Sequence, residues 1–164
     1  MIESWLEEPA RKAAEYIEAN ELEPMKNRGA WGIQKLKRTT ARDLQLCIRV
    51  EAAEEFCGTC ECVTCGRVDC YKTMQAGHFI PTRSNAVLFL ERHIHPQCIR
   101  CNNYLGGALA EYTTFMNERN TPEEMEALRQ LRHRTRTYSQ DELLTMRTSY
   151  RHRTQEARNL KGID

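Results

Sequence analysis

The chain has 164 residues, of which 40% are hydrophobic and 29% are charged, and its formal net charge at pH 7 is +1. A chain of this length can bury about one domain's core, which excludes two independent domains of ordinary size. It has no run of about 18 uncharged apolar residues, and acidic residues stand where a signal peptide needs basic ones. We therefore expect a cytoplasmic protein that is neither secreted nor inserted into a membrane.

The charges are distributed unevenly along the chain. Residues 1–23 carry seven acidic residues, whereas residues 26–49 carry seven basic residues against Asp43 alone. Residues 129–161 form a second basic block, with nine Lys or Arg against three acidic residues. Local charge is therefore more informative than net charge.

Two helices are predicted in the first third of the chain. Apolar residues near helical spacing predict an acidic amphipathic helix over residues 4–19, which Pro9 either starts or kinks. The next stretch, up to residue 38, contains Pro and Gly and is typical of a basic linker. A second helix is predicted to start near Thr40 and to run until Gly58.

The remaining elements are a ribbon and further helices. Short apolar runs over residues 73–80 and 87–95 predict a two-stranded ribbon with a long loop. A helical turn or two is expected from Cys98, and helix-capping patterns at Thr121 and Ser139 predict two C-terminal helices. The expected fold class is α+β. Its predicted parts are an acidic helix and basic linker over 1–39, a zinc-binding core over 40–118 and a basic helical region over 119–164.

Cysteine spacing gives the clearest chemical signal. Six of the eight cysteines lie in two clusters, "FCGTCECVTCG" and "HPQCIRCNN". In a chain without an export signal, Cys-x-x-Cys pairs favour metal binding over disulfides, and two pairs supply a tetrahedral four-thiolate zinc site. There are three pairs, so either one is surplus or a second ion binds. The pairs are Cys57/Cys60, Cys62/Cys65 and Cys98/Cys101.

The region between the clusters carries a possible catalytic pattern. A strand bearing His78, a second strand and a helix that opens with a cysteine pair resemble the ββα-metal (HNH-type) nucleases. In those enzymes a ribbon His deprotonates water, and a polar side chain at the helix start holds a divalent cation, Mg²⁺ or Mn²⁺. The resemblance implies that His78 is the base and that Asn102 is a cation ligand. Asn102 alternatively caps the helix.

The runs "QAGHF", "LFLERHIHPQC" and "CIRCNNYLGG" also resemble the NinG/Rap family of phage recombination endonucleases, over roughly residues 44–118. That family implies cleavage of branched DNA, such as Holliday junctions and D-loops, in the cytoplasm of the host cell. The cysteine layout is similar to that of phage endonuclease VII as well. This likeness implies a structural zinc site from which Cys57 and Cys60 are excluded. Its ligands are then Cys62, Cys65, Cys98 and Cys101.

The second cation ligand departs from the HNH pattern. HNH enzymes commonly place Asp or His directly before the catalytic His, and this chain has Gly77 there. On an extended strand Glu91, His93 and His95 face the same way, so we expect one of them to complete the cation site. His95 is therefore also a catalytic candidate, and His93 alternatively orients His78.

Basic residues on both sides of this motif favour salt-dependent contacts with the DNA backbone. The residues expected to bind DNA are Arg83, Arg100, Lys35, Lys37 and Arg38. Two other functions stay open: a zinc-containing nucleic-acid-binding module that does not cleave, and an adaptor that recruits other phage recombination proteins through the acidic N-terminal helix.

A homodimer is expected because a four-way junction needs two symmetric cuts and each chain has one site. Apolar residues of the terminal helices are the expected interface, unless they pack on the chain's own core. These residues are Trp5, Leu6, Ile17, Leu128, Leu131, Leu143, Leu144, Met146 and Tyr150.

Overall fold

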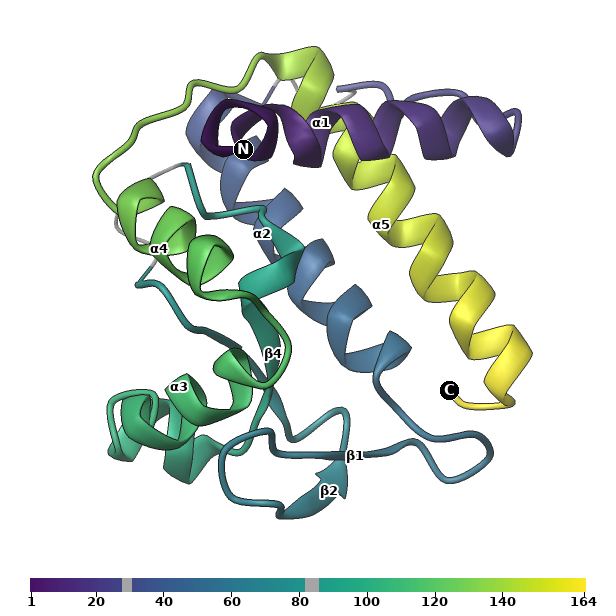
Figure 1. Ribbon diagram of the computed structural model, residues 1–164. Helices are drawn as coiled ribbons and strands as arrows, with labels where there is room; N and C mark the ends of the chain where they lie inside the picture. Colours follow the sequence, from purple (N-terminus) through teal and green to yellow (C-terminus); the bar gives the residue numbers. More distant parts are fainter. Residues whose placement is uncertain (28–30, 82–85) are drawn as a thin grey trace.

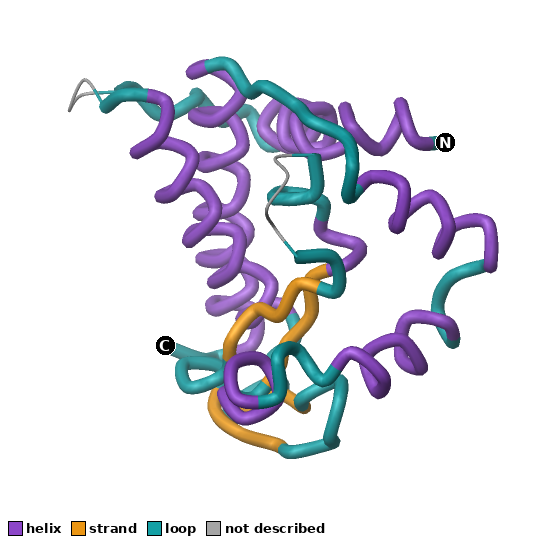
Figure 2. Tube along the Cα trace, turned by 90° about the vertical axis from the view of Figure 1, so that its left-hand side faces the viewer, coloured by secondary structure: helices purple, strands orange, loops and turns teal. Residues whose placement is uncertain are grey.

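The computed structural model describes residues 1–27, 31–81 and 86–164. These residues form an α+β fold with helices and small antiparallel sheets, and the strands gather at the end of the molecule away from α1 (Figures 1 and 2). In chain order, the elements are α1 (Ile2–Ala19), α2 (Ile33–Glu51), β1 (Thr59–Glu61), β2 (Val68–Cys70), β3 (Gln75–His78), a 3-10 helix (Glu91–His93), β4 (Ile94–Gln97), a π-helical segment (Arg100–Tyr104), α3 (Leu109–Asn117), α4 (Pro122–Leu131) and α5 (Gln140–Lys161).

Helices α2 and α5 lie side by side, and α1 packs across α5 (Figure 1). We call these three helices the helical layer. Most buried apolar residues of α2 and α5 recur every three or four positions, as amphipathic helices require, and belong to one apolar cluster, whereas Trp5 and Leu6 of α1 belong to another. Each such side chain contributes about 1.5–3 kcal/mol when it is fully buried. The cluster includes Leu44, Cys47 and Ile48 of α2 and Leu143, Met146 and Tyr150 of α5. None of the described helices is long and apolar enough to cross a membrane.

The N-terminal helices differ from their predicted bounds. Helix α1 runs on both sides of Pro9, so this residue does not start it. Helix α2 begins at Ile33 rather than near Thr40, because Leu36 is buried in the contact with α5 and extends the apolar stripe by a turn. It ends at Glu51, well before Gly58. The predicted boundary after residue 39 therefore falls inside a helix.

The predicted ribbon exists, but its second strand is shorter and lies further along the chain. Strands β3 and β4 pair antiparallel, with Gly77 opposite His95 and His78 opposite Ile94. The predicted strand over residues 87–95 is wrong for most of its length, because residues 86–89 form turns and a 3-10 helix precedes β4. A second two-stranded sheet, β1 with β2, carries the first cysteine cluster.

Both predicted starts of the C-terminal helices are confirmed. Thr121 and Ser139 accept hydrogen bonds from the backbone N–H groups of Glu124 and Glu142, whose side chains bond back to the capping residues. All the apolar residues expected at a dimer interface are buried within the chain, from Trp5 to Tyr150. These side chains therefore pack on the chain's own core. The homodimer stays a prediction, and these residues do not support it.

The uneven charge distribution is partly balanced by ion pairs between elements distant in sequence. Arg136 pairs with Glu7 and Glu142, at 2.6 and 2.9 Å. Arg134 pairs with Glu3. Further pairs join α5 to α2 and to the 3-10 helix: Arg147 with Asp43, and Arg153 with Glu51 and Glu91. Four of the nine basic residues of the second block, Arg134, Arg136, Arg147 and Arg153, are therefore paired with acidic residues of the same chain.

Candidate metal centre and active site

Four cysteines from the two predicted clusters meet beside the ribbon. The sulfur atoms of Cys62, Cys65, Cys98 and Cys101 lie within 4.8 Å of one another. A tetrahedral zinc ion with Zn–S bonds of about 2.3 Å places its sulfurs about 3.8 Å apart. The sulfurs of Cys65 and Cys98 are 3.8 Å apart, so the cluster can hold a structural zinc ion. Four thiolates fill the coordination sphere and leave no position for a reactant.

Hydrogen bonds favour the thiolate form of one cysteine in this cluster, Cys62. Burial raises the pKa of Cys62, but bonds from the Thr64 hydroxyl and from nearby backbone N–H groups outweigh it and lower the pKa to about 6.

The third cysteine pair lies outside the cluster, as predicted. The exposed Cys57 contacts Thr59, and the buried Cys60 belongs to β1.

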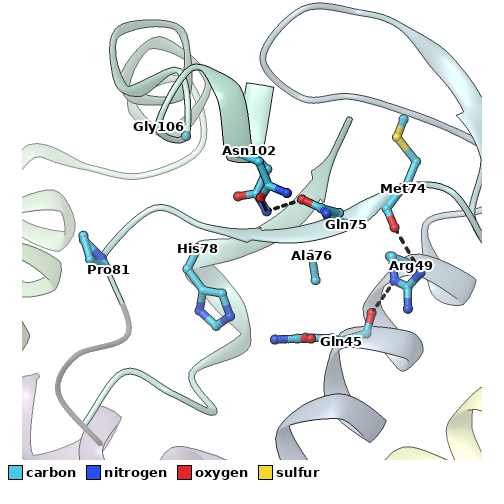
Figure 3. A pocket seen from close by; sticks show the side chains of 11 residues that line it. Gln45, Arg49, Met74, Gln75, Ala76, His78, Pro81, Asn102 and Gly106 are labelled. Carbon is cyan, nitrogen blue, oxygen red and sulfur yellow. Dashed lines mark hydrogen bonds between the residues drawn. The ribbon is translucent and has the colours of Figure 1, made fainter. Parts of the chain in front are cut away.

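A cavity of about 660 Å³ opens next to the ribbon, between α2, β3 and the π-helical segment (Figure 3). It brings together His78 and Asn102, the two residues predicted as base and cation ligand. Among the described residues, no acidic side chain lines it, and Arg49 is its one cationic residue. The lining residues are Gln45, Arg49, Met74, Gln75, Ala76, His78, Pro81, Asn102, Asn103, Gly106 and Gly107.

His78 ends β3 and is kept neutral by its surroundings. Its Nδ1 atom is buried and has no hydrogen-bond partner among the described residues. Burial lowers the pKa of His78 to about 4, so the ring is unprotonated at neutral pH and can accept a proton. Its ring centroid lies 5.4 Å from that of His93, at an interplanar angle of 59°.

Asn102 is held by a neighbouring amide. Its Nδ2 donates to Oε1 of Gln75 at 2.7 Å, which leaves Oδ1 of Asn102 available as an oxygen ligand. Its backbone N–H donates to the carbonyl of Cys98, four residues back, at 3.0 Å. Asn102 is thus inside the helical segment, and the alternative that it caps the helix is wrong. π-helical turns of this kind often occur at functional sites.

Helix α2 contributes two lining residues that the sequence did not indicate. Arg49 donates through Nη1 to the carbonyls of Tyr71 and Met74, at 2.9 and 3.0 Å, and through Nε to that of Gln45. These bonds fix the guanidinium at the start of β3, while Nη2 has no bond to another described residue. Burial lowers the pKa of Arg49. An Arg side chain nevertheless stays charged at neutral pH.

The backbone at Gly77, directly before His78, lies against the side chain of Gln97. A Cβ atom on Gly77 would lie 2.0 Å from Oε1 of Gln97, on the paired strand. The buried Gln97 donates through Nε2 to the carbonyl of Gly107 at 2.8 Å and to the Thr64 hydroxyl at 3.3 Å. Gln97 therefore links the ribbon to the residues that border the cavity, and a side chain at position 77 would have to displace it. Asn103 is a further amide in the cavity that the sequence analysis missed.

The structure does not bring His93 or His95 into the cavity. His93 is fully buried, with Nε2 2.7 Å from the carbonyl of Val87 and Nδ1 accepting from the N–H of Ile80. Both ring nitrogens are engaged, which contradicts a role as cation ligand and leaves only ring contact with His78. His95 points to α3, where Nδ1 lies 3.1 Å from the Tyr112 hydroxyl.

Glu91 likewise lies away from the cavity. Its carboxylate pairs with Arg153 of α5. The expectation that Glu91, His93 and His95 share one face is wrong, because Glu91 and His93 belong to a 3-10 helix instead of a strand.

The predicted DNA-binding residues that the structure describes belong to α2 and to the π-helical segment. Lys35 and Arg38 are exposed on α2, where Lys35 stands 4.2 Å over the Trp31 ring, and Lys37 is half-buried. Arg100 is exposed beside a smaller cavity. Arg83 lies outside the described residues.

The family model described as Bacteriophage Lambda NinG protein matches residues 8–160. The chain belongs to the NinG family. Membership in this family indicates a function related to phage recombination. The match extends beyond the ribbon and covers most of α1 and α5 as well as the cysteine-bearing region. Comparison with curated proteins and with solved structures gave no match.

Proposed function

We propose that this NinG-family chain is a metal-dependent endonuclease that hydrolyses phosphodiester bonds in branched DNA, such as Holliday junctions and D-loops. One observation carries the proposal: a neutral imidazole, amide oxygens and an arginine border one cavity that has no acidic lining residue among those described. A cavity of this charge suits an anionic phosphate, and its residues supply a proton acceptor and oxygen ligands.

In this mechanism His78 accepts a proton from the water whose oxygen attacks the phosphorus. The bond from phosphorus to the leaving sugar oxygen breaks, and that oxygen takes a proton from solvent water. Burial keeps the imidazole unprotonated, and a phosphate anion entering the cavity raises its pKa towards neutrality. The Arg49 guanidinium, fixed by the carbonyls of Tyr71 and Met74, binds the phosphate through its remaining Nη2 group. Packing holds the His78 ring and backbone carbonyls hold the Arg49 guanidinium, which limits the movement of both groups during the reaction.

Asn102 would hold the divalent cation, Mg²⁺ or Mn²⁺. Amide oxygens are suitable ligands for such hard ions, which commonly complete their coordination with water and substrate phosphate. When bound, the cation supplies stabilisation of the charge that develops on the phosphate. Gln75 orients Asn102 by accepting its Nδ2–H, so that Oδ1 is presented to the cation. Because no carboxylate contributes, we expect tight cation binding only when DNA is present.

The deciding experiment incubates the full chain with a four-way junction, a D-loop and a linear duplex of matched sequence, with Mg²⁺, with Mn²⁺ and with no divalent cation. We expect cation-dependent cleavage that prefers the branched substrates. The His78→Ala variant should lose activity by about 100-fold or more, with unchanged thermal stability and DNA binding, because it lacks the base. The matched control is His133→Ala, which replaces an exposed histidine outside the cavity.

Other outcomes select the alternatives. Full activity of His78→Ala would refute the mechanism. Junction binding by the wild-type chain without cleavage would identify a non-cleaving nucleic-acid-binding module, a function that the missing carboxylate favours. If the wild-type chain neither binds nor cleaves the junction, the adaptor function remains. In an active enzyme, Asn102→Ala should raise the Mg²⁺ concentration for half-maximal cleavage, and an unchanged concentration would remove Asn102 from the cation site.

A further inference from the structure

Three large apolar side chains lie exposed next in sequence to residues that line the cavity, and we call them the apolar rim. Tyr104 is 81% exposed, Leu105 is 49% exposed and Leu109 is 61% exposed. Tyr104 and Leu105 directly follow Asn102 and Asn103, and Leu105 and Leu109 stand before and after Gly106 and Gly107. These two asparagines and two glycines line the cavity. Figure 3 shows Gly106 on the same side of the cavity as Asn102. An apolar group that a protein leaves in water beside a polar cavity is a candidate contact surface.

The backbone that carries this apolar rim is constrained. The N–H of Ala108 donates to the carbonyl of Leu105 at 3.0 Å and closes a turn from Leu105 to Ala108, directly before Leu109. Gly106, Gly107 and Ala108 all have positive φ, at 58°, 93° and 47°. Left-handed backbone at a non-glycine residue is unfavourable, so surrounding contacts must hold it. One such contact is the bond from Gln97 to the carbonyl of Gly107, which ties the turn to the ribbon.

Charge and position indicate what this rim contacts. The rim adjoins a cavity that contains Arg49 and no described acidic residue, and the exposed Arg100 begins the same π-helical segment. A ligand that places a phosphate in the cavity and a flat apolar ring on the rim matches both surfaces. A nucleotide with an unstacked base has this shape, and aromatic side chains bind such bases by stacking. In continuous duplex DNA the bases stack on one another and are not available.

We propose that Tyr104, with Leu105 and Leu109, binds an unstacked base of branched DNA next to the phosphate in the cavity. The inference deepens the proposed nuclease function and rests on it, because it gives the source of selectivity for branched over linear DNA. Tyr104 supplies the stacking surface. Leu105 and Leu109 form the apolar border that separates this base from its neighbours.

The test measures binding of the full chain to a four-way junction and to a linear duplex of the same sequence, without added divalent cation, and cleavage of both with Mg²⁺. Tyr104→Ala should weaken junction binding by about 10-fold and duplex binding by less than about 2-fold, because only the junction offers an unstacked base. Tyr104→Phe keeps the ring and should behave like the wild type. Leu160→Ala is the matched control, since Leu160 is 77% exposed on α5, outside the cavity.

The outcomes separate this inference from the proposed function. If the wild type cuts junctions and Tyr104→Ala keeps the wild-type ratio of junction to duplex binding, the rim has no role and only the inference fails. An equal loss on both substrates also overturns it, since that result indicates a general contact. A wild type that binds junctions through Tyr104 without cutting refutes the nuclease and supports the rim. A wild type that binds no junction refutes both.

Discussion

The helical layer of α1, α2 and α5 and the cysteine-bearing region from β1 to α3 are stabilised by different interactions. The layer contains long amphipathic helices with a continuous apolar contact and several ion pairs between helices. The cysteine-bearing region consists of two two-stranded sheets and short helices. Isolated two-stranded ribbons are marginal in water, so this region needs an additional constraint, which four clustered thiolates can supply through a metal ion.

The candidate active site lies where these two regions meet. Arg49 and Gln45 come from α2, whereas His78 and Asn102 come from the ribbon and the π-helical segment. The geometry of the cavity therefore depends on both kinds of stabilisation. Changes confined to one region should have separable effects on stability and on DNA cleavage.

The largest effect is expected from removing a zinc ligand. Cys98→Ser should abolish zinc binding and unfold the cysteine-bearing region, because binding of a structural zinc contributes on the order of 10 kcal/mol to folding. The helices of the layer should persist, so the far-ultraviolet circular dichroism should keep most of its helical signal. Cys57→Ser is the matched control, since Cys57 is exposed and outside the cluster. Loss of zinc in Cys57→Ser but not in Cys62→Ser would contradict the ligand assignment.

Acid should destabilise the cysteine-bearing region next most strongly. Burial lowers the pKa of His78 to about 4 and that of His93 to about 3, His93 being further affected by the adjacent His78. Burial and the nearby Arg119 lower the pKa of His95 to about 4. In the unfolded chain these groups titrate near 6.5, so between about pH 6.5 and 4 the unfolded state binds more protons. Their contribution to stability is complete above pH 6.5 and is lost as the pH falls towards 4.

Urea unfolding at several pH values measures this dependence. Each histidine contributes a slope of up to about 1.4 kcal/mol per pH unit, so the wild type should lose stability with a slope approaching three times that value. His78→Asn should reduce this slope by the contribution of one histidine, up to about 1.4 kcal/mol per pH unit. Protonation of the thiolates affects the wild type and the variant equally. An unchanged slope in His78→Asn would show that His78 is solvated in the folded protein.

Local sequence rules predicted the parts of the site that depend on spacing. Cys-x-x-Cys spacing predicted a four-thiolate cluster but left three pairs to choose from. The resemblance to known nucleases selected Cys62/Cys65 with Cys98/Cys101, and it also assigned His78 and Asn102 to one site. Residues fixed by distant contacts were missed. Helix α2 starts seven residues early because it packs on α5, as shown by Thr40 donating to the carbonyl of Leu143, 103 positions away. Arg49 was missed for the same reason, since its role depends on where α2 meets β3.

The pair of Gly77 and Gln97 shows the same limit within the ribbon. Its close contact follows from the register that sets Gln75 opposite Gln97 and Gly77 opposite His95. Register depends on the turn between the strands, and no residue pattern along one strand reveals it.

Gly77→Ala tests this contact directly. The added methyl group would overlap Oε1 of Gln97 and displace its bonds to Gly107 and Thr64, so the variant should lose about 1–3 kcal/mol of unfolding free energy. The double variant with Gln97→Ala should recover part of this loss, since the smaller side chain removes the overlap. Gly32→Ala, where a Cβ meets nothing within 4 Å, is the control and should change stability by well under 1 kcal/mol. Equal effects of the two Gly substitutions would contradict the packing at the ribbon.

An effect of about the same size is expected in the helical layer. Arg153 of α5 bonds to Glu91 and Glu51, each at 2.8 Å, with its side chain 20% exposed. Arg153→Met keeps the apolar stem but leaves two carboxylates without their partner, which should cost about 1–3 kcal/mol because the site is only partly solvated. Arg129→Met is the matched control, since Arg129 and its partner Glu126 are both more than half exposed, and it should change stability by less than about 0.5 kcal/mol. Zinc content should stay at the wild-type level in both variants. Loss of zinc in Arg153→Met would show that the two regions fold as one unit, because a change in the layer would then have disrupted the cysteine cluster.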